Sequence, residues 1–175
     1  MPYETIHSET LYHGRAFNVR RDEIRLPDGK TARLEIVDHV GAVTLVPVDE
    51  QNRVWFVRQY RHPAGEVLLE LPAGMVEPGE APLDCARREI REEIGMAAGR
   101  MEPIGEFYLA PGYSTEFMHV VLARDLHPDP LPGDADEFIS PEAIPFEVVL
   151  RMIDSGKIHD AKTLAALMLA KRYLI

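Results

Sequence analysis

The sequence has few cysteines, few basic residues and no long apolar run, and each shortage excludes a class of protein. With Cys85 as the only cysteine, no intrachain disulfide can form, which excludes a disulfide scaffold and favours a reducing compartment. Nineteen Lys and Arg against 29 Asp and Glu give a net charge of −10, which argues against a nucleic-acid or anionic-membrane partner. No segment reads as a signal peptide or a membrane span. We therefore expect a cytoplasmic protein.

The length of 175 residues, with 46% hydrophobic and 27% charged residues, suits one globular domain with a small appendage. Strands are predicted within residues 4–26, at 31–37, 42–48, 54–60, 67–71, 104–109 and 117–123. Helices are predicted from Pro82, at 145–153 and at 161–173, the last with Leu164, Leu167, Met168 and Tyr173 facing inward. This order predicts an α+β fold with a mixed sheet. Residues 1–40 form an antiparallel β extension in this interpretation, and residues 41–175 form the main domain.

The segment 74–96 carries the strongest functional signal. Pro82 suits the first turn of a helix and Gly95 suits its end. On that helix Glu89, Glu92 and Glu93 stand at i, i+3 and i+4, so three carboxylates share one face. A separate apolar stripe is available for burial: Leu83, Ala86, Ile90 and Ile94.

Two interpretations of this helix are open from its own residues. Interleaved arginines (Arg87, Arg88, Arg91) are typical of a solvated charged face. Alternatively, the carboxylates bind a hard divalent cation such as Mg²⁺, which takes oxygen ligands and offsets their mutual repulsion.

The wider spacing resembles the signature of the Nudix hydrolases at every fixed position. It runs Gly74, five residues, Glu80, seven residues, Arg88-Glu89-Ile90, one residue, Glu92-Glu93, one residue, Gly95-Met96. The resemblance implies a Nudix-type α/β/α sandwich with a mixed sheet. It also implies hydrolysis of a diphosphate linked to another moiety, with Mg²⁺ as cofactor and Mn²⁺ as a substitute.

The resemblance assigns a role to each motif residue. Glu89 and Glu93 are expected to bind the metal, with Glu92 as a further ligand or a supporting group and the Ala73 carbonyl as another ligand. Arg88 and Glu80 are expected to orient these carboxylates, and Arg88 precedes Glu92 by the four residues that a helical ion pair needs. Gly74 is expected to let the backbone approach the metal.

Features outside the motif resemble the ADP-ribose pyrophosphatase subgroup of nucleoside-diphosphate-sugar hydrolases. These features are Glu70–Gly74 (ELPAG), Pro111 at 15 residues beyond Met96, the N-terminal strands, and residues 156–163 near the C-terminus. The subgroup implies cleavage of ADP-ribose to AMP and ribose 5-phosphate. It also implies a homodimer that exchanges its N-terminal strands, to which exposed strand edges are suited.

Four substrate contacts follow from the same resemblance. Phe17 is expected to stack on adenine, Arg33 to hold base or phosphate, Arg58 to contact phosphate, and Glu116 to lie near the terminal ribose. From the residues alone, either Arg58 or Arg61 suits a phosphate contact, and both also suit an exposed strand end. Phe17 equally suits a core position, and Arg33 a solvated one.

The resemblance places the general base outside the motif helix, in the acidic loop that holds Asp134, Asp136 and Glu137. Glu137 is the residue expected to act as the general base. Glu93 acting as both metal ligand and base stays an alternative. The acidic loop also suits a solvated connector with no role in catalysis. Other functions stay open too: a GDP-mannose or other sugar-nucleotide pyrophosphatase, a non-catalytic ligand sensor, and an acidic interaction module.

Overall fold

The computed structural model describes residues 3–133 and 138–174, and it divides the chain into two compact units. The N-terminal unit contains the chain up to Gly41 together with Tyr108–Phe117. The larger unit contains Ala42–Phe107 and the chain from Met118 onward. None of the helices in the described residues is both long and apolar enough to cross a bilayer.

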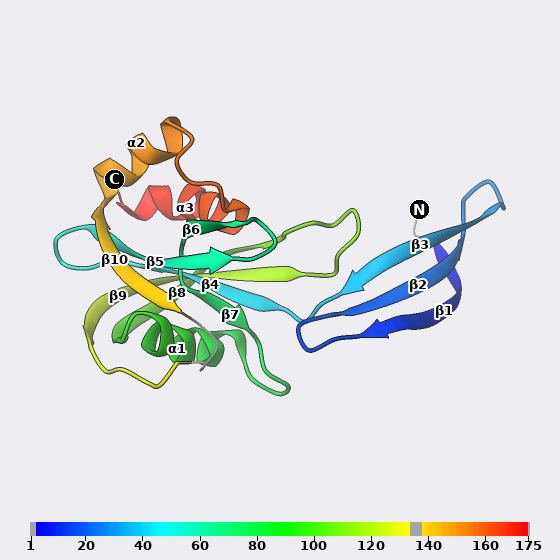
Figure 1. Ribbon diagram of the computed structural model, residues 1–175, viewed down its shortest axis with the longest axis horizontal. Helices are drawn as coiled ribbons and strands as arrows, with labels where there is room; N and C mark the ends of the chain where they lie inside the picture. Colours follow the sequence, from blue (N-terminus) through cyan, green and yellow to red (C-terminus); the bar gives the residue numbers. More distant parts are fainter. Residues whose placement is uncertain (1–2, 134–137, 175) are drawn as a thin grey trace. The chain divides into compact units, whose positions relative to one another are not determined.

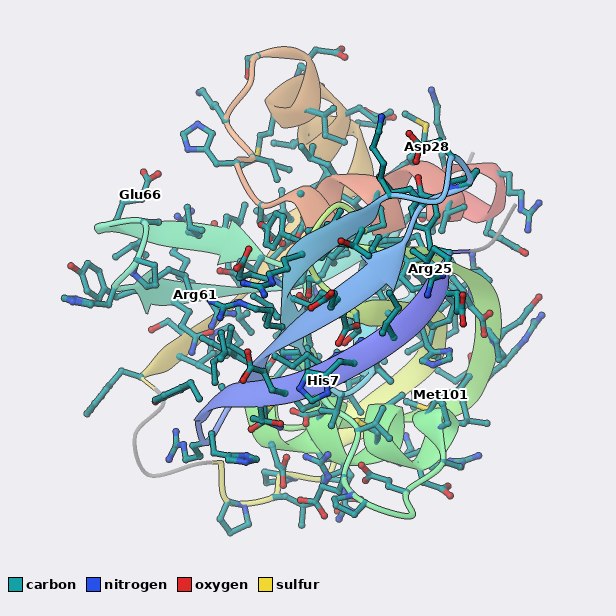
Figure 2. The ribbon with its side chains drawn as sticks, turned by 90° about the vertical axis from the view of Figure 1, so that its right-hand side faces the viewer. His7, Arg25, Asp28, Arg61, Glu66 and Met101 are labelled. Atoms are coloured by element: carbon teal, nitrogen blue, oxygen red, sulfur yellow. The ribbon has the colours of Figure 1, made fainter. Side chains whose placement is uncertain are left out.

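The N-terminal unit is built on an antiparallel sheet in the order β1-β2-β3, with strands Glu4–His13, Asn18–Arg25 and Thr31–Asp38. Ion pairs link neighbouring strands: Arg25 binds Glu4 at 2.9 Å and Arg21 binds Glu35 at 3.1 Å. Arg25 and Asp28 lie at the end of the sheet where β2 turns into β3 (Figure 2). Since all residues of β1 are exposed, backbone pairing with β2, together with these ion pairs, holds this strand rather than burial of its side chains.

In the part of the chain that the structure describes, the strands of the larger unit form two sheets. One has the order β7-β4-β9-β8, formed by Ala73–Met75, Ala42–Pro47, Phe117–Pro128 and Met96–Tyr108. In it β4 pairs with β9 in parallel and with β7 antiparallel, so the sheet is mixed. The other has the antiparallel order β10-β5-β6, formed by Ile139–Pro145, Arg53–Arg61 and Glu66–Glu70.

Among the described residues, three helices cover the two faces of these strands (Figure 1). Helix α1 (Pro82–Glu93) lies on one face, and α2 (Phe146–Asp154) and α3 (Ala161–Leu174) lie on the other. Each face has its own apolar cluster. Ile90 of α1 packs with Leu45 and Val57, whereas Leu167 of α3 packs in the cluster that contains Phe56. The α/β/α sandwich predicted from the sequence is confirmed.

The structure adds two strands that the sequence analysis did not predict. Strand β7 has three residues, too few for a periodic pattern. Strand β10 contains Pro141 and Pro145, which argue against a central strand, but it lies at the edge of its sheet, where the missing N–H groups are tolerated. Strands β8 and β9 are also longer than predicted.

The inward face of α3 was predicted wrongly at one position. Met168 is 68% exposed, whereas Leu167 beside it is 1% exposed. The buried residues of α3 recur at helical spacing, and they include small side chains as well as large ones: Thr163, Ala166, Leu167, Ala170 and Leu174. Met168 falls outside that repeat.

This difference predicts unequal costs for two neighbouring truncations. Leu167→Ala should reduce the free energy of unfolding by about 2–5 kcal/mol, because it leaves a cavity in the core. Met168→Ala, the control on the same helix, should change it by about 0.5 kcal/mol or less. Urea denaturation followed by circular dichroism measures both, and equal losses would contradict this description of α3.

Candidate active site

Helix α1 is anchored by its apolar side and presents its acidic side to β7. Cys85, Ala86 and Ile90 are fully buried, which fixes the rotation of the helix about its own axis. As a result Glu89 and Glu93 are each only 8% exposed. Gly95 follows the helix with a φ of 70°, a backbone conformation that glycine adopts without strain. The burial of the stripe therefore sets the direction of the carboxylates.

Arg88 connects the carboxylates of this site. Its Nη1 donates to Glu89 Oε1 at 2.6 Å and to Glu92 Oε2 at 3.0 Å. Its Nε and Nη2 each donate to Glu80 at 3.1 Å, and Nη2 also donates to the Met75 carbonyl at 3.2 Å. The hydrogen bond from Arg88 holds the pKa of Glu80 below its ordinary value. One guanidinium thus links three carboxylates to the backbone of β7.

Two of the acidic side chains also meet the backbone of β7 directly. Glu93 Oε2 accepts a hydrogen bond from the Ala73 N–H at 3.0 Å. Glu89 lies so close to Gly74 that a Cβ placed on that residue would fall 1.8 Å from Glu89 Oε1. Only glycine leaves room for this carboxylate, which gives the glycine of the motif a steric explanation.

The donor set suits a hard divalent cation. Glu89, Glu92, Glu93 and the Ala73 carbonyl offer oxygen ligands from two adjoining elements, and oxygen ligands are what Mg²⁺ and Mn²⁺ prefer. Across the described ranges no group of three or more His, Cys, Asp or Glu side chains is already gathered around one point. Instead, the Arg88 guanidinium bridges Glu89 and Glu92, so a bound cation competes with Arg88 for both carboxylates.

Cys85 of the same helix is not a reactive residue. Its side chain is buried and its Sγ lies 3.3 Å from the Met75 carbonyl oxygen. Burial, together with the charges of Glu89 and Glu80, raises the pKa of the thiol to about 12. Cys85 is therefore a packed thiol of the α1 core.

A second charged cluster lies beside the loop that leads into β7. Arg61 at the end of β5 donates twice to Glu70, from Nε at 2.7 Å and from Nη2 at 2.8 Å. Lys162 also pairs with Glu70. Burial alone would raise the pKa of Glu70, but these two cations hold it below its ordinary value. Hydrogen bonding to Glu70 raises the pKa of Arg61, and the charge of Glu93 adds to that effect.

Glu70 and Lys162 were not predicted to have a role, although one signal in the sequence pointed to Glu70. Glu70 is an acidic residue within an apolar strand, Val67–Leu71, and a buried acid needs a cation. The sequence does not identify that cation, because Lys162 lies 92 residues away from Glu70 in the chain.

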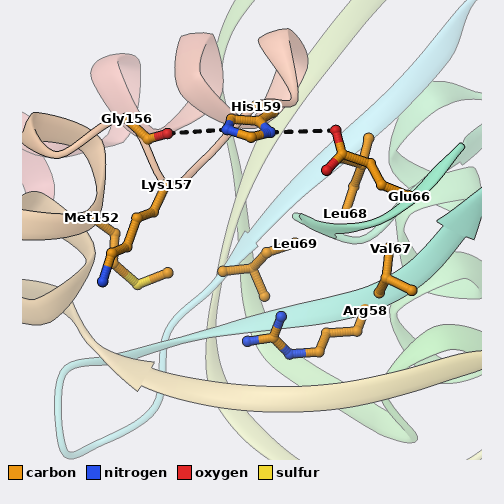
Figure 3. Close-up of a pocket in the computed structure, with 9 residues that line it drawn as sticks. All are labelled: Arg58, Glu66, Val67, Leu68, Leu69, Met152, Gly156, Lys157 and His159. Atoms are coloured by element: carbon orange, nitrogen blue, oxygen red, sulfur yellow. Dashed lines mark hydrogen bonds and ion pairs between the residues drawn. The ribbon is translucent and has the colours of Figure 1, made fainter. Parts of the chain in front are cut away.

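Arg58 lies on the opposite face of β5 from Arg61. It donates to Glu142 at 2.7 Å and lines a pocket of about 390 Å³ with Leu69, Met152 and Lys157 (Figure 3). Strand alternation places Arg58 on the side of Phe56, toward α2 and α3, and Arg61 on the side of Val57, toward α1. The contact of Arg58 with phosphate stays a prediction.

The other three residues predicted to contact the substrate lie outside the unit that contains α1. Phe17 (42% exposed), Arg33 and Glu116 belong to the N-terminal unit. Arg33 pairs with Glu23 at 3.7 Å, and the Glu116 N–H donates to Ser114 at 3.2 Å. Asp134, Asp136 and Glu137 lie outside the described residues.

Comparison with known proteins identifies the family. Residues 38–167, more than half of the chain, match the NUDIX domain family. The chain belongs to the Nudix family. Residues 3–33 of this Nudix hydrolase also match the family described as Nucleoside diphosphate sugar hydrolase N-terminal domain. The predicted enzyme class is confirmed, which sets aside the ligand sensor and the interaction module.

Individual relatives agree with this assignment. The Nudix hydrolase is 35% identical to an ADP-ribose pyrophosphatase of Bacillus subtilis (strain 168), over 94% of this chain and 90% of the relative. It is 33% identical to a GDP-mannose pyrophosphatase of Yersinia pestis (strain Pestoides F), over 75% of this chain and 70% of the relative. A crystal structure of an ADP compounds hydrolase superposes with a TM-score of 0.89 at 25% identity, covering 99% of this chain and 95% of that one.

The contact between Gly74 and Glu89 predicts a selective loss of metal binding. A methyl group at Gly74→Ala displaces the Glu89 carboxylate, a flexible side-chain end, so the fold should survive. We expect Mn²⁺ affinity, measured by electron paramagnetic resonance, to fall by about 10–100-fold with little change in melting temperature.

Gly112→Ala is the control for this variant, because a Cβ there meets no atom within 4 Å and the backbone φ is not positive. Gly112→Ala should bind Mn²⁺ as the wild type does. Unchanged Mn²⁺ affinity in Gly74→Ala would show that the approach of Glu89 to this glycine is irrelevant to the metal.

Proposed function

We propose that this Nudix hydrolase cleaves the diphosphate of ADP-ribose, releasing AMP and ribose 5-phosphate. The observation that carries the proposal is the gathering of Glu89 and Glu93 against the backbone of Ala73 and Gly74. The names of the relative from Bacillus subtilis and of the ADP compounds hydrolase support this choice of substrate.

The proposed cofactor is Mg²⁺, with Mn²⁺ as a substitute, held by Glu89, Glu92, Glu93 and the Ala73 carbonyl. When bound, the cation neutralises charge on the diphosphate and lowers the pKa of a bound water. Glu93 is oriented for this role by the Ala73 N–H, and Arg88 holds Glu89 and Glu92 on the same side of α1. In the proposed reaction Arg88 also carries positive charge close to the substrate phosphates.

The remaining roles are proposals that the described contacts leave open. We propose that Phe17, Arg33, Arg58 and Glu116 contact the nucleotide sugar, and that Glu137 is the general base. Arg61 is a further candidate for phosphate, because Glu93 contributes to its raised pKa and it lies on the α1 side of β5. Glu93 acting as both metal ligand and base stays the alternative to Glu137.

A GDP-mannose pyrophosphatase is the second candidate function, favoured by the relative from Yersinia pestis. Both substrates present a diphosphate to the same carboxylates, so the motif does not distinguish them. Discrimination between the adenine and guanine bases of the substrates depends instead on contacts such as the one proposed for Phe17.

Substrate and mechanism can be tested together with purified enzyme and Mg²⁺. We expect AMP release from ADP-ribose with a higher kcat/KM than GMP release from GDP-mannose, and loss of both on metal removal with EDTA. Glu93→Gln should lower kcat by about 10²-fold or more while the protein stays folded, because the amide carries no negative charge for the cation. Chromatography of the products measures each rate.

Glu147→Gln is the matched control, since this glutamate is exposed at the start of α2 on the other face of the sheets. It should retain wild-type activity. A clear preference for GDP-mannose would reject the first substrate, and full activity of Glu93→Gln would reject the proposed metal site.

We also propose a homodimer in which residues 1–40 exchange between subunits and residues 41–175 form the catalytic domain. The support is the apolar surface of the N-terminal strands, where Ile6, Leu11 and Tyr12 are 42–57% exposed on the edge strand β1. A cytoplasmic location is proposed as well, supported by the single cysteine.

Sedimentation equilibrium tests the dimer. The expected mass is about twice the 19.7 kDa of one chain. The double variant Ile6→Glu and Leu11→Glu should sediment as a monomer, because charge is then buried at the contact. Val67→Glu, which changes an exposed apolar residue of the larger unit, should leave the dimer intact. A monomeric wild type would reject the proposal.

A further inference from the structure

The start of α3 is bonded to the loop that enters the active site. Thr163 is fully buried, and its Oγ1 accepts a hydrogen bond from the Leu71 N–H at 2.8 Å. Asp160 caps the helix by accepting from the Thr163 N–H at 3.0 Å. A side chain from the C-terminal helix therefore supplies the partner that the buried Leu71 N–H needs.

A buried ion cluster reinforces this contact one residue earlier. The Glu70 side chain is almost completely buried and is paired with Arg61 and with Lys162. Lys162 also pairs with Asp160 at 3.0 Å, so the capping residue of α3 and the end of β6 share one ammonium group. A buried carboxylate depends strongly on each of its cations, and removal of Lys162 leaves Glu70 incompletely paired.

The three residues beyond Glu70 are then held in series. Leu71 is bonded to Thr163, the Pro72 carbonyl accepts from the Leu45 N–H at 2.8 Å, and the Ala73 N–H donates to Glu93. Glu93, the acceptor of this last hydrogen bond, belongs to α1. The first turn of α3 and an acidic residue of α1, on opposite faces of the sheets, are thus joined through Leu71–Ala73.

We infer that Lys162 and Thr163 are positioning residues for Glu93. They fix the Leu71–Ala73 segment, which in turn aims the Ala73 N–H at the Glu93 carboxylate. This inference rests on the proposed function insofar as Glu93 is taken to bind the metal. Its structural content, the control of the Ala73 amide by α3, is measurable in the metal-free protein.

A matched pair of substitutions isolates the Thr163 contact. Thr163→Val has nearly the same shape but no acceptor for the Leu71 N–H, whereas Thr163→Ser keeps the oxygen. In Thr163→Val we expect hydrogen exchange at the Ala73 amide, measured by NMR without metal, to be at least about tenfold faster, and kcat to fall by about tenfold. The KM should stay within about twofold, and Thr163→Ser should restore both exchange and kcat.

A second pair tests the ion cluster. Lys162→Met keeps the aliphatic stem and removes the charge, whereas Lys162→Arg keeps the charge. Lys162→Met should change amide exchange and kcat in the same direction as Thr163→Val, with Lys162→Arg closer to the wild type. Lys171→Met is the control, since Lys171 is exposed in the last turn of α3.

Each outcome decides the inference. Folded Thr163→Val and Lys162→Met proteins with wild-type exchange at Ala73 would overturn it, as would a fall in kcat that Thr163→Ser does not restore. If both variants fail to fold, the contacts stabilise the domain as a whole and the inference is wrong. Absence of hydrolysis by the wild type would reject the proposed function alone, because amide exchange at Ala73 still reports on the contact with α3.

Discussion

Repulsion among Glu89, Glu92 and Glu93 is the constraint on which the rest of this site depends. Like charges at i, i+3 and i+4 oppose a helix by about 0.2–0.5 kcal/mol for each pair. Helix α1 nevertheless forms, because its apolar stripe is buried and Arg88 binds two of the three carboxylates. Packing on one side of the helix thus offsets an electrostatic cost on the other.

The burial of these carboxylates explains why the backbone of β7 lies so close to α1. A carboxylate that is only 8% exposed needs hydrogen-bond donors, and the Ala73 N–H supplies one to Glu93. Gly74 provides the space in which Glu89 lies. The motif is therefore a strand and a helix that complete each other, and neither holds the carboxylates alone.

How much of this could be predicted depended on the distance in sequence between the groups involved. The Arg88–Glu92 pair and the shared face of the three glutamates follow from helical periodicity over a few residues, so the sequence sufficed. The contact of Glu70 with Lys162 spans 92 residues, and nothing local identifies the partner. Short or proline-containing strands such as β7 and β10 were not predicted for a different reason. Their local sequence pattern is weak, and they form because of tertiary pairing with β4 and β5.

The face on which a strand residue lies was the other limit. Arg58 and Arg61 are indistinguishable by residue type, and the choice between them depends on which side of β5 faces α1. The packing of Val57 beside Ile90 places Arg61 on the α1 side of β5 and Arg58 on the opposite side. This placement also bears on how a protein of net charge −10 can meet an anionic substrate. Arg61 is held near the glutamates by the buried Glu70, and Arg88 is held there by the partly buried Glu80, so two guanidinium groups lie beside the carboxylates of the proposed diphosphate site, whatever the overall charge of the chain.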